Sequence, residues 1–531
     1  APPPIPGAPH SSPLYTADFA GNKHYLSLSA GCEIGMMCAW FVPSRSRTFS
    51  FPNNWRSIVS GLFGIVSKTG CSDVLFYGTD YHSHLGTQFG GIAVHGDGFV
   101  RQIHNIGQSQ FKSKFHEDRA RLRGSKGIGV ISALDEQPIY VRSRFGPFCI
   151  ATDGFIDNAG ALAEEFLAAG GSFSEFGMRG NVNLTELVAK LITRGSSIGD
   201  GIDRMFEAID GSCSLLLLHE DGVYAARDRL GYFSLAIGRR DGAWAVATET
   251  SSFANLGFRV EKYLAPSEIV LITDRGLMEV RPGTETNNTC AFLWIYTGFP
   301  TSSYEGINVE VVRERSGAAL ARRDRDIEVD LVSGIPDSGI GHALGYAIES
   351  GRPFRRPLVK YTPGYGRSYT PPSQETRDLV AKMKLIPNEE IIRGNRIVVC
   401  EDSIVRGTQL KNYTVRKLWD GGAREVHARP ACPPLMYPCR FNLSTRSLDE
   451  LAARRAIRSL EGRDTEDVSA YIDHRTAQYR KMVEWIARDL EVTTLRYQTL
   501  EDMIAAIGLP KERLCLYCWT GAYPAPGKRR E

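Results

Sequence analysis

Residues 396–410 read RIVVCEDSIVRGTQL, in which four apolar residues are followed directly by two carboxylates and a short polar loop. The apolar run at 397–400 predicts a strand that is buried on both faces, as in a parallel sheet flanked by helices. Glu401 and Asp402 would then lie at the carboxyl end of this strand, where α/β sheets bind their ligands. The stretch therefore predicts an α/β domain with a ligand site at one edge of its sheet.

The turn SIVRGT, residues 403–408, has the composition of a phosphate-binding loop. We expect a helix to begin near Thr408, and its free N–H groups, its dipole and the hydroxyls of Ser403 and Thr408 favour an anion. Gly407 lets the backbone approach a ligand closely. The two preceding carboxylates suit vicinal sugar hydroxyls and can position Mg²⁺ through water. A phosphate beside two hydroxyls describes a ribose 5-phosphate; the alternative is an ordinary strand end with solvated acids.

The sequence on both sides of this loop repeats the strand–helix order. The apolar segment VDLVSGIP (329–336) precedes the helical pattern SGIGHALGYAIESG (338–351), and a further apolar segment starts EVHARP at Glu425. Buried strands that alternate with helices imply a parallel sheet. We therefore expect an α/β domain over 282–445, followed by charged helical segments over 446–531.

The preceding part of the chain has a different pattern. Over 60–281 short apolar segments alternate with Gly and Asp turns, as in SLLLLHEDGVYAARD (214–228), and helical patterns such as NLTELVAKLITRG (183–195) intervene. Strands joined by hairpins, with helices packed on their faces, predict an α+β domain. Residues 1–59 are rich in proline and turn formers, so we expect a poorly ordered extension there, with a transit-type leader as the alternative.

Composition excludes several classes of protein. The chain has 531 residues, too many for one ordinary core, and 63 basic against 60 acidic side chains give a formal net charge of +3. This balance gives no general attraction to nucleic acid or membranes, and no apolar run reaches the length of a membrane span. Eleven cysteines, an odd number, do not indicate a secreted disulfide framework. We expect a cytoplasmic protein that binds neither nucleic acid nor membrane.

The residues VVCEDSIVRGTQ (398–409) resemble the phosphoribosyl pyrophosphate (PRPP) motif of type I phosphoribosyltransferases. The SIVRGT form is most similar to the glutamine PRPP amidotransferase (amidophosphoribosyltransferase) family, which usually has two Asp where this chain has Glu401 and Asp402. The resemblance implies that these two acids act in catalysis and hold Mg²⁺. It also implies a set of PRPP-binding loop residues: Ser403, Ile404, Val405, Arg406, Gly407 and Thr408.

Two further segments resemble the parts of this family that hold the diphosphate. SGIPDSGIGHALGYA (333–347) resembles the pyrophosphate loop and assigns PRPP binding to Asp337, Ser338 and Gly339.

KYTPGYGRSYTPPSQETRDLVAKMKLIPN (360–388) resembles the family's flexible loop, and implies that Arg367 and Lys384 contact the leaving group. Departing diphosphate builds negative charge, which cationic side chains stabilise in the transition state. Lys360 is a further PRPP-binding candidate, with an ordinary surface lysine as the alternative.

The segments SGLFGIVSKTG (60–70) and DYHSHLGTQFGGIAV (80–94) resemble the family's N-terminal-nucleophile glutaminase domain, which has an αββα fold. The resemblance implies that residues 60–281 keep this fold. The catalytic groups differ, however.

Ser60 stands inside the chain where the family has an N-terminal Cys, whose free amine serves as the base. Asp153-Gly154 replaces the Asn-Gly of the oxyanion hole, and a carboxylate there would repel an oxyanion. The segment GVISALDEQP (129–138) has no Arg to bind glutamine, and Leu184 stands where an acid is expected. We therefore predict an inactive glutaminase, and ammonia rather than glutamine as the nitrogen donor.

Cys515 and Cys518 form a C-x-x-C pair, a spacing that suits zinc, an iron–sulfur cluster or redox chemistry. The family resemblance extends to Cys290 and Cys439, and implies that these four residues hold a [4Fe–4S] cluster. Zinc or free thiols are the alternatives.

The resemblance as a whole implies an Mg²⁺-dependent amidophosphoribosyltransferase of purine biosynthesis, a pentosyltransferase that forms phosphoribosylamine. It also implies inhibition by purine nucleotides and a homotetramer or homodimer. Two other functions remain open at this point: a PRPP-dependent transferase with another acceptor, and a non-catalytic paralogue that senses PRPP or nucleotides.

Overall fold

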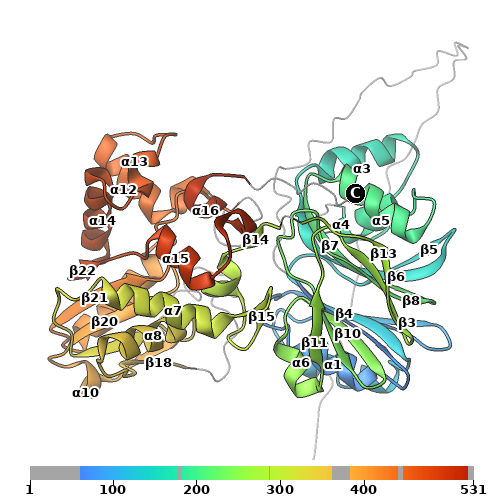
Figure 1. Ribbon diagram of the computed structural model, residues 1–531, viewed down its shortest axis with the longest axis horizontal. Helices are drawn as coiled ribbons and strands as arrows, with labels where there is room; N and C mark the ends of the chain where they lie inside the picture. The colour runs from blue at the N-terminus through green and yellow to red at the C-terminus, as the bar shows by residue number, and fades with distance from the viewer. Residues whose placement is uncertain are drawn as a thin grey trace, which may run out of the picture. The chain divides into compact units, whose positions relative to one another are not determined.

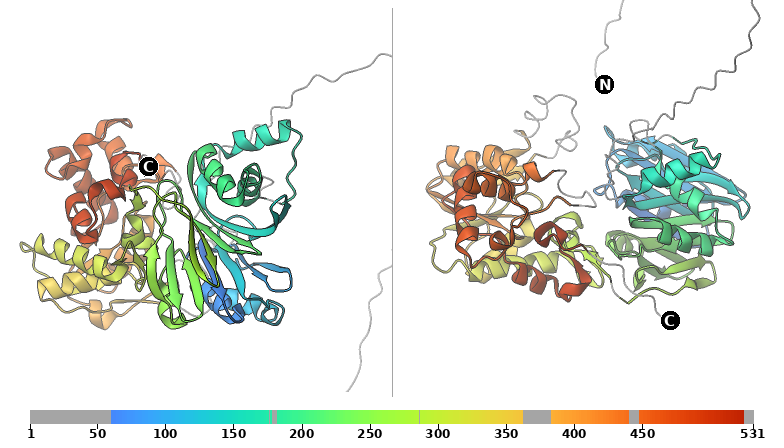
Figure 2. Two further views of the ribbon diagram at one scale, coloured as in Figure 1. Left: turned by 45° about the vertical axis from the view of Figure 1, so that its right-hand side comes forward. Right: turned by 90° about the horizontal axis from the view of Figure 1, so that it is seen from above.

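The computed structural model (Figures 1 and 2) describes residues 60–175, 177, 182–285, 287–361, 383–439 and 447–523. The predicted extension 1–59 and the predicted catalytic residue Arg367 lie outside these ranges. Within them, no helix combines the length and the apolar character that a membrane span needs.

The first half of the described chain contains two antiparallel sheets that pack face to face. In spatial order, the first sheet consists of β11 (Arg259–Tyr263), β9 (Ala236–Arg240), β10 (Ala243–Ala247), β1 (Gly61–Ser67), β4 (Lys126–Ser132), β2 (Phe89–His95) and β3 (Phe99–Asn105). The second consists of β13 (Gly276–Arg281), β12 (Ile269–Thr273), β8 (Gly222–Ala226), β7 (Gly211–His219), β6 (Gly146–Ile156) and β5 (Ile139–Ser143).

Strand β1 shows how the layers form. Leu62 and Val66 pack against the second sheet, whereas Phe63 and Ile65 pack against α1 (Ser72–Asp80), because successive side chains of a strand point to opposite faces. On the outer face of the second sheet, α4 (Leu184–Ile192) and α5 (Ile198–Ala208) complete the apolar core. The predicted αββα layering is thereby confirmed.

The second half is built on a parallel sheet, as predicted. Its strands, in spatial order, are β17 (Leu331–Gly334), β20 (Arg396–Glu401), β21 (Glu425–Pro430) and β22 (Thr494–Leu495). Val398 and Cys400 of β20 pack toward α7 (Val309–Arg322) and α8 (Ile340–Ser350).

Ile397 and Val399 of β20 face the opposite way, toward the C-terminal helices α12 (Ala452–Glu461) and α14 (Ala477–Leu490). The predicted strand is therefore buried on both faces. The domain boundaries after residues 281 and 445 stay predictions.

A buried cluster of charged groups ties the strands of the parallel sheet to α7 and α8. Arg429 of β21 has no exposed side-chain surface and forms an ion pair with Asp324, whose side chain is 1% exposed. Tyr346 donates a hydrogen bond to Asp324 Oδ2 at 2.8 Å, and Arg496 contacts Asp324 Oδ1 at 2.8 Å. Arg496 also pairs with the exposed Asp326 at 2.5 Å.

This cluster predicts a large difference between two neighbouring acids. Asp324→Asn leaves the buried Arg429 without its counter-charge, so we expect a loss of about 3–5 kcal/mol in the free energy of unfolding. Asp326→Asn removes only an exposed partner of Arg496 and should cost less than about 1 kcal/mol. Denaturant unfolding of both variants measures the difference, and equal losses would contradict the assignment.

Candidate active site

The carboxyl end of β20 brings together two segments that the sequence predicted to bind PRPP. Glu401 is the last residue of the strand and Asp402 follows it, and Ser338, from the loop after β17, donates a hydrogen bond to Glu401 Oε1 at 3.1 Å. Ser403 donates to Asp402 Oδ2 at 2.6 Å. The parallel pairing of β17 with β20, Gly334 opposite Cys400, places the two loops at the same sheet edge.

Two glycines allow the loop after β17 to pack on the strand end. A Cβ atom on Gly339 would lie 2.2 Å from the carbonyl oxygen of Cys400, and one on Gly334 would lie 2.4 Å from the carbonyl oxygen of Gly339. Any side chain at either position would push the loop off the sheet. Gly339 directly precedes α8, so the predicted diphosphate residues lie at the start of that helix.

The adjacent acids at the strand end are removed from solvent to different degrees. Asp402 is 6% exposed and Glu401 is half-buried. Burial and the neighbouring charge of Asp402 raise the pKa of Glu401 well above its ordinary value. A cation or a hydroxyl donor bound here would therefore be stabilised by both carboxylates.

The two predicted lysines contact or line different parts of the predicted site. Lys360 ends β18 (Leu358–Lys360) and forms an ion pair with Asp337. Lys384 lies, with Glu401, in the wall of a cavity of about 90 Å³. The remaining lining residues are Ile335, Pro336, Leu385, Gln409, Leu410, Tyr413 and Thr414.

Gln409 and Tyr413 in this wall did not appear among the predicted site residues. They are four residues apart on the helical segment that begins at Thr408, so they lie on one face of it. This spacing of four residues is the feature of the sequence from which their shared helix face could have been predicted. The segment continues as a π-helix over Leu410–Val415 and then as α11 (Arg416–Asp420).

Position 407 requires glycine for the shape of the loop as well as for close approach to a ligand. Its φ of +77° lies in the left-handed region, which other residues rarely adopt. A Cβ atom there would also lie 2.9 Å from Leu490 Cδ2 of α14. The turn of the loop and its packing against the C-terminal helices therefore both depend on this position.

The glutaminase-like half brings Ser60 and Asp153 together. The backbone N–H of Ser60 donates to Asp153 Oδ1 at 2.8 Å, and Asp153 is 1% exposed. Burial, with a smaller effect from the charge of Asp228, raises the pKa of Asp153 to about 8. The sequence predicts a carboxylate at position 153 that would repel an oxyanion; the fold instead favours the neutral acid at neutral pH, because Asp153, on β6 beside β7, is buried against Ser60 just before β1. Gly154 beside it packs tightly, since a Cβ atom would lie 2.1 Å from Ser212 O.

Four cysteines from distant parts of the sequence gather around Tyr232. Cys290 of β14 (Thr289–Cys290) lies opposite Cys515 of β23 (Leu514–Cys515) in a parallel strand pair. The Tyr232 hydroxyl lies 3.7 Å from Cys439 Sγ. A hydrogen bond with Cys439, together with burial, raises the pKa of Cys518. All four are buried. Among the described residues, no group of three or more His, Cys, Asp or Glu side chains has the geometry to hold a metal ion.

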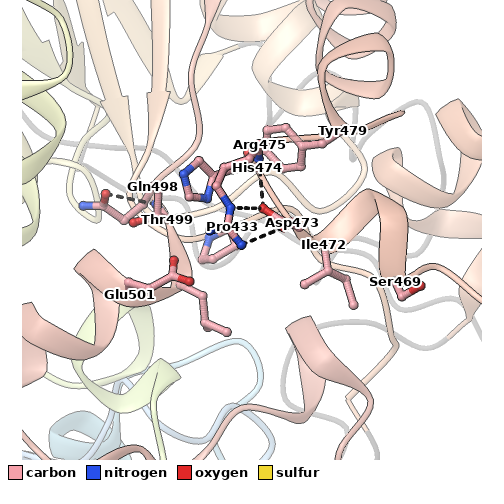
Figure 3. A pocket seen from close by; sticks show the side chains of 11 residues that line it. Pro433, Ser469, Ile472, Asp473, His474, Arg475, Tyr479, Gln498, Thr499 and Glu501 are labelled. Atoms are coloured by element: carbon pink, nitrogen blue, oxygen red, sulfur yellow. Dashed lines mark hydrogen bonds and ion pairs between the residues drawn. The ribbon is translucent and has the colours of Figure 1, made fainter. Parts of the chain in front are cut away.

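A larger cavity, of about 270 Å³, lies among the C-terminal helices (Figure 3). Arg475 forms two hydrogen bonds of 2.9 Å with Asp473 beside it. The cavity's other lining residues are Pro433, Ser469, Ile472, His474, Tyr479, Gln498, Thr499, Leu500 and Glu501. None of the predicted PRPP-binding residues lines this cavity.

Comparison with known proteins identifies relatives of both halves. Residues 125–255 match the family model for a glutamine amidotransferase domain. Amidophosphoribosyltransferase of Methanocaldococcus jannaschii is 30% identical over 492 residues, which cover 87% of this chain and 97% of the relative. Amidophosphoribosyltransferase of Bacillus subtilis is 29% identical over 482 residues, which cover 87% of this chain and 94% of the relative.

Solved structures give the same result. The glutamine PRPP amidotransferase of B. subtilis, complexed with ADP and GMP, superposes with a TM-score of 0.75 at 28% identity, covering 87% of this chain and 97% of that one. The predicted fold class, a glutaminase-like αββα domain followed by a type I phosphoribosyltransferase domain, is thereby confirmed. With 30% identity over nearly the whole length of a relative, the chain belongs to the amidophosphoribosyltransferase family.

Proposed function

We propose that this protein is an amidophosphoribosyltransferase that forms 5-phosphoribosylamine from PRPP and ammonia in purine biosynthesis. One observation carries the proposal: the acids Glu401 and Asp402 at the end of β20, hydrogen-bonded to Ser338 and Ser403 of the two predicted substrate loops. The family membership supports it.

Different residues of the site bind different groups of PRPP. The N–H groups and hydroxyls of the loop 403–408 bind the 5-phosphate, and Glu401 and Asp402 accept hydrogen bonds from the ribose hydroxyls. Ammonia forms a bond to C1 as the bond from C1 to the diphosphate oxygen breaks, and the new amine loses a proton to solvent. Lys384 and Arg367 stabilise the charge on the departing diphosphate. No protein nucleophile is needed, because positioning and charge stabilisation do the work.

Mg²⁺ is part of this proposal. The paired carboxylates Glu401 and Asp402 are oxygen donors of the kind that Mg²⁺ prefers, and a bound ion would offset their mutual repulsion. When bound with PRPP, it would neutralise part of the diphosphate charge.

Regulation by purine nucleotides and assembly into a homodimer or homotetramer also remain proposals. The solved B. subtilis relative is complexed with ADP and GMP, which supports testing adenine and guanine nucleotides as inhibitors. The cytoplasmic location stays a prediction.

A [4Fe–4S] cluster on Cys290, Cys439, Cys515 and Cys518 is supported by four buried thiols gathered around one tyrosine. Thiolates on a cluster bind different irons, so they need not converge on one point as ligands of a single ion do. Such a cluster would tie the C-terminal segment to β14 and stabilise the protein rather than act in the reaction.

An inactive glutaminase is supported by the position of Ser60. Its nitrogen is part of a peptide bond and donates its hydrogen to Asp153, so it has no lone pair available to act as a base.

The nitrogen donor gives the first test. We expect diphosphate release from PRPP and Mg²⁺ with ammonium, and none above background with glutamine or with neither. The measurement is the initial rate with anaerobically purified protein. Release with glutamine would contradict the inactive glutaminase, and no release with any donor would contradict the proposed function.

A matched pair of lysines controls this experiment. Lys384→Met removes a cation from the site wall and should lower kcat by roughly a hundredfold, the usual effect of removing one charge-stabilising group. Lys481→Met changes an exposed lysine on α14 and should leave the rate unchanged.

The cysteine proposal predicts about four irons and four sulfides per chain after anaerobic purification. Cys518→Ser should lose the iron and its visible absorbance, whereas Cys71→Ser, a buried thiol in the other half, should keep both. Zinc in place of iron in the native protein would contradict the proposal.

Asp153 predicts a pH-dependent stability. Its folded pKa of about 8 exceeds the ordinary value near 3.9, so folding favours the protonated acid, and stability falls as pH rises from about 4 to about 8. Asp153→Asn removes this cost and still accepts from Ser60. Its stability gain over wild type should grow by at most roughly 4 kcal/mol between pH 5 and pH 8.

Melting temperatures at the two pH values measure this effect. Asp241→Asn, on an exposed turn of the same half, is the control and should show no pH-dependent gain. A gain from Asp153→Asn that does not change with pH would mean that Asp153 is ionised in the folded protein.

A further inference from the structure

The predicted phosphate loop is held from outside by the segment at the start of α12. The backbone N–H of Ala452 donates to the carbonyl oxygen of Val405 at 2.7 Å. Arg455 Nη2 donates to the carbonyl oxygen of Arg406 at 2.8 Å. The Arg406 side chain in turn pairs with Glu450 at 2.7 Å. Two successive loop carbonyls and one loop side chain are therefore bound by residues about 50 positions later in the chain.

α14, the other C-terminal helix that covers β20, supports the same contact. Asp489 of α14 holds the Arg455 guanidinium at 3.1 Å, so this side chain bridges α14 and the loop. Leu490 packs against Gly407 closely enough to exclude a Cβ atom there. Glu491 pairs at 2.9 Å with Lys411, one turn into the helical segment that follows the loop.

Binding these carbonyls also determines where the loop amides point. In a planar trans peptide the C=O and the following N–H point in opposite directions. When the carbonyls of Val405 and Arg406 point to α12, the N–H groups of Arg406 and Gly407 point away from α12. Successive N–H groups that share one direction form an anion-binding concavity.

We propose that Arg455 is a positioning residue of the phosphate loop. It holds the Arg406 carbonyl, while the Ala452 N–H holds the Val405 carbonyl and Glu450 holds the Arg406 side chain, so that the loop amides are oriented before the 5-phosphate arrives. It contacts no substrate atom. The inference rests on the proposed function, because it assigns the loop 403–408 to a phosphate. A loop ordered in advance binds more tightly, since the ligand does not have to offset the entropy of ordering it.

Arg458, one turn further along α12, provides a matched control. Among the residues that the structure describes, its ion pairs are with Asp449 at 2.6 Å and Asp464 at 3.7 Å, and no hydrogen bond or ion pair joins it to the loop 403–408. Its side chain is 40% exposed against 36% for Arg455. Replacing either arginine removes one charge from the same helix, with one ion pair for Arg455 and two for Arg458, so a larger effect at Arg455 reports on the loop.

The test compares Arg455→Met, Arg455→Lys and Arg458→Met with wild type. Ribose 5-phosphate, titrated calorimetrically, reports on the phosphate loop without turnover, and KM and kcat are measured with PRPP and ammonium. We expect Arg455→Met to weaken ribose 5-phosphate binding and to raise KM about tenfold, with kcat within about twofold, because the 5-phosphate is remote from the reacting carbon. Arg455→Lys, which keeps a cationic donor, should recover part of the loss, and Arg458→Met should match wild type.

Equal affinities of Arg455→Met and Arg458→Met would overturn the proposal, as would a fall in kcat with KM unchanged. If Arg455→Met does not fold, the affinity of Arg455→Lys for ribose 5-phosphate is compared with that of wild type. Equal affinities of these two proteins would overturn the proposal. Wild type that binds ribose 5-phosphate but releases no diphosphate would contradict the proposed function and leave this inference standing. Wild type that binds neither compound would overturn both.

Discussion

Two adjacent carboxylates at the end of a doubly buried strand are the constraint from which the site follows. β20 has no exposed face along 397–400, so the first polar groups of this stretch can appear only where the strand leaves the sheet. Glu401 and Asp402 are these groups, and neither can be fully solvated. The loop hydroxyls of Ser338 and Ser403 satisfy part of their hydrogen-bonding capacity, and the rest is available to water, a ligand or an ion.

The C-terminal helices are part of this site although they contribute no predicted substrate contact. α12 and α14 cover the face of β20 that carries Ile397 and Val399. α12 also donates hydrogen bonds to carbonyl groups of the loop 403–408, and α14 packs against Gly407 of that loop. Val405 also packs against the apolar core that contains the four cysteines. The helices that cover β20, the loop 403–408 and the four cysteines therefore belong to one continuous packed region. A change at the cysteines can reach the loop through the contact of Val405 with this core.

The sequence predicted the elements better than the contacts between them. β20 could be recognised because its apolar run is short and ends in two acids, and the α+β character of the first half because Gly and Asp turns separate its short apolar segments; the αββα layering was implied only by the family resemblance. The contacts of Ser60 with Asp153 and of Arg406 with Arg455 join residues 93 and 49 positions apart. Such contacts depend on sheet order and helix packing, which local patterns do not encode. The neutral state of Asp153 was missed for the same reason, since burial is a tertiary property.

The core of the αββα half does not depend on the positions of a glutaminase site. Its core consists of aliphatic side chains from both sheets, such as Leu62, Val130 and Leu216, and none of the groups that a glutaminase needs belongs to that core. Substitutions at those positions therefore leave this core intact. Losing the whole half would not be equivalent, because it supplies partners for charges buried at its junction with the rest of the chain.

Glu249 illustrates this dependence. It is 1% exposed and lies 2.8 Å from His84 in the αββα half, while Tyr304 and Ser302, from the segment leading to the parallel-sheet half, donate hydrogen bonds to it. Nearby, Arg227 has no exposed side-chain surface and pairs with Glu305 at 2.9 Å. Removing the αββα half would leave Glu305, Ser302 and Tyr304 without these partners, and unpaired buried groups are strongly destabilising. Its retention therefore follows from the electrostatics of the junction, whether or not it still hydrolyses glutamine.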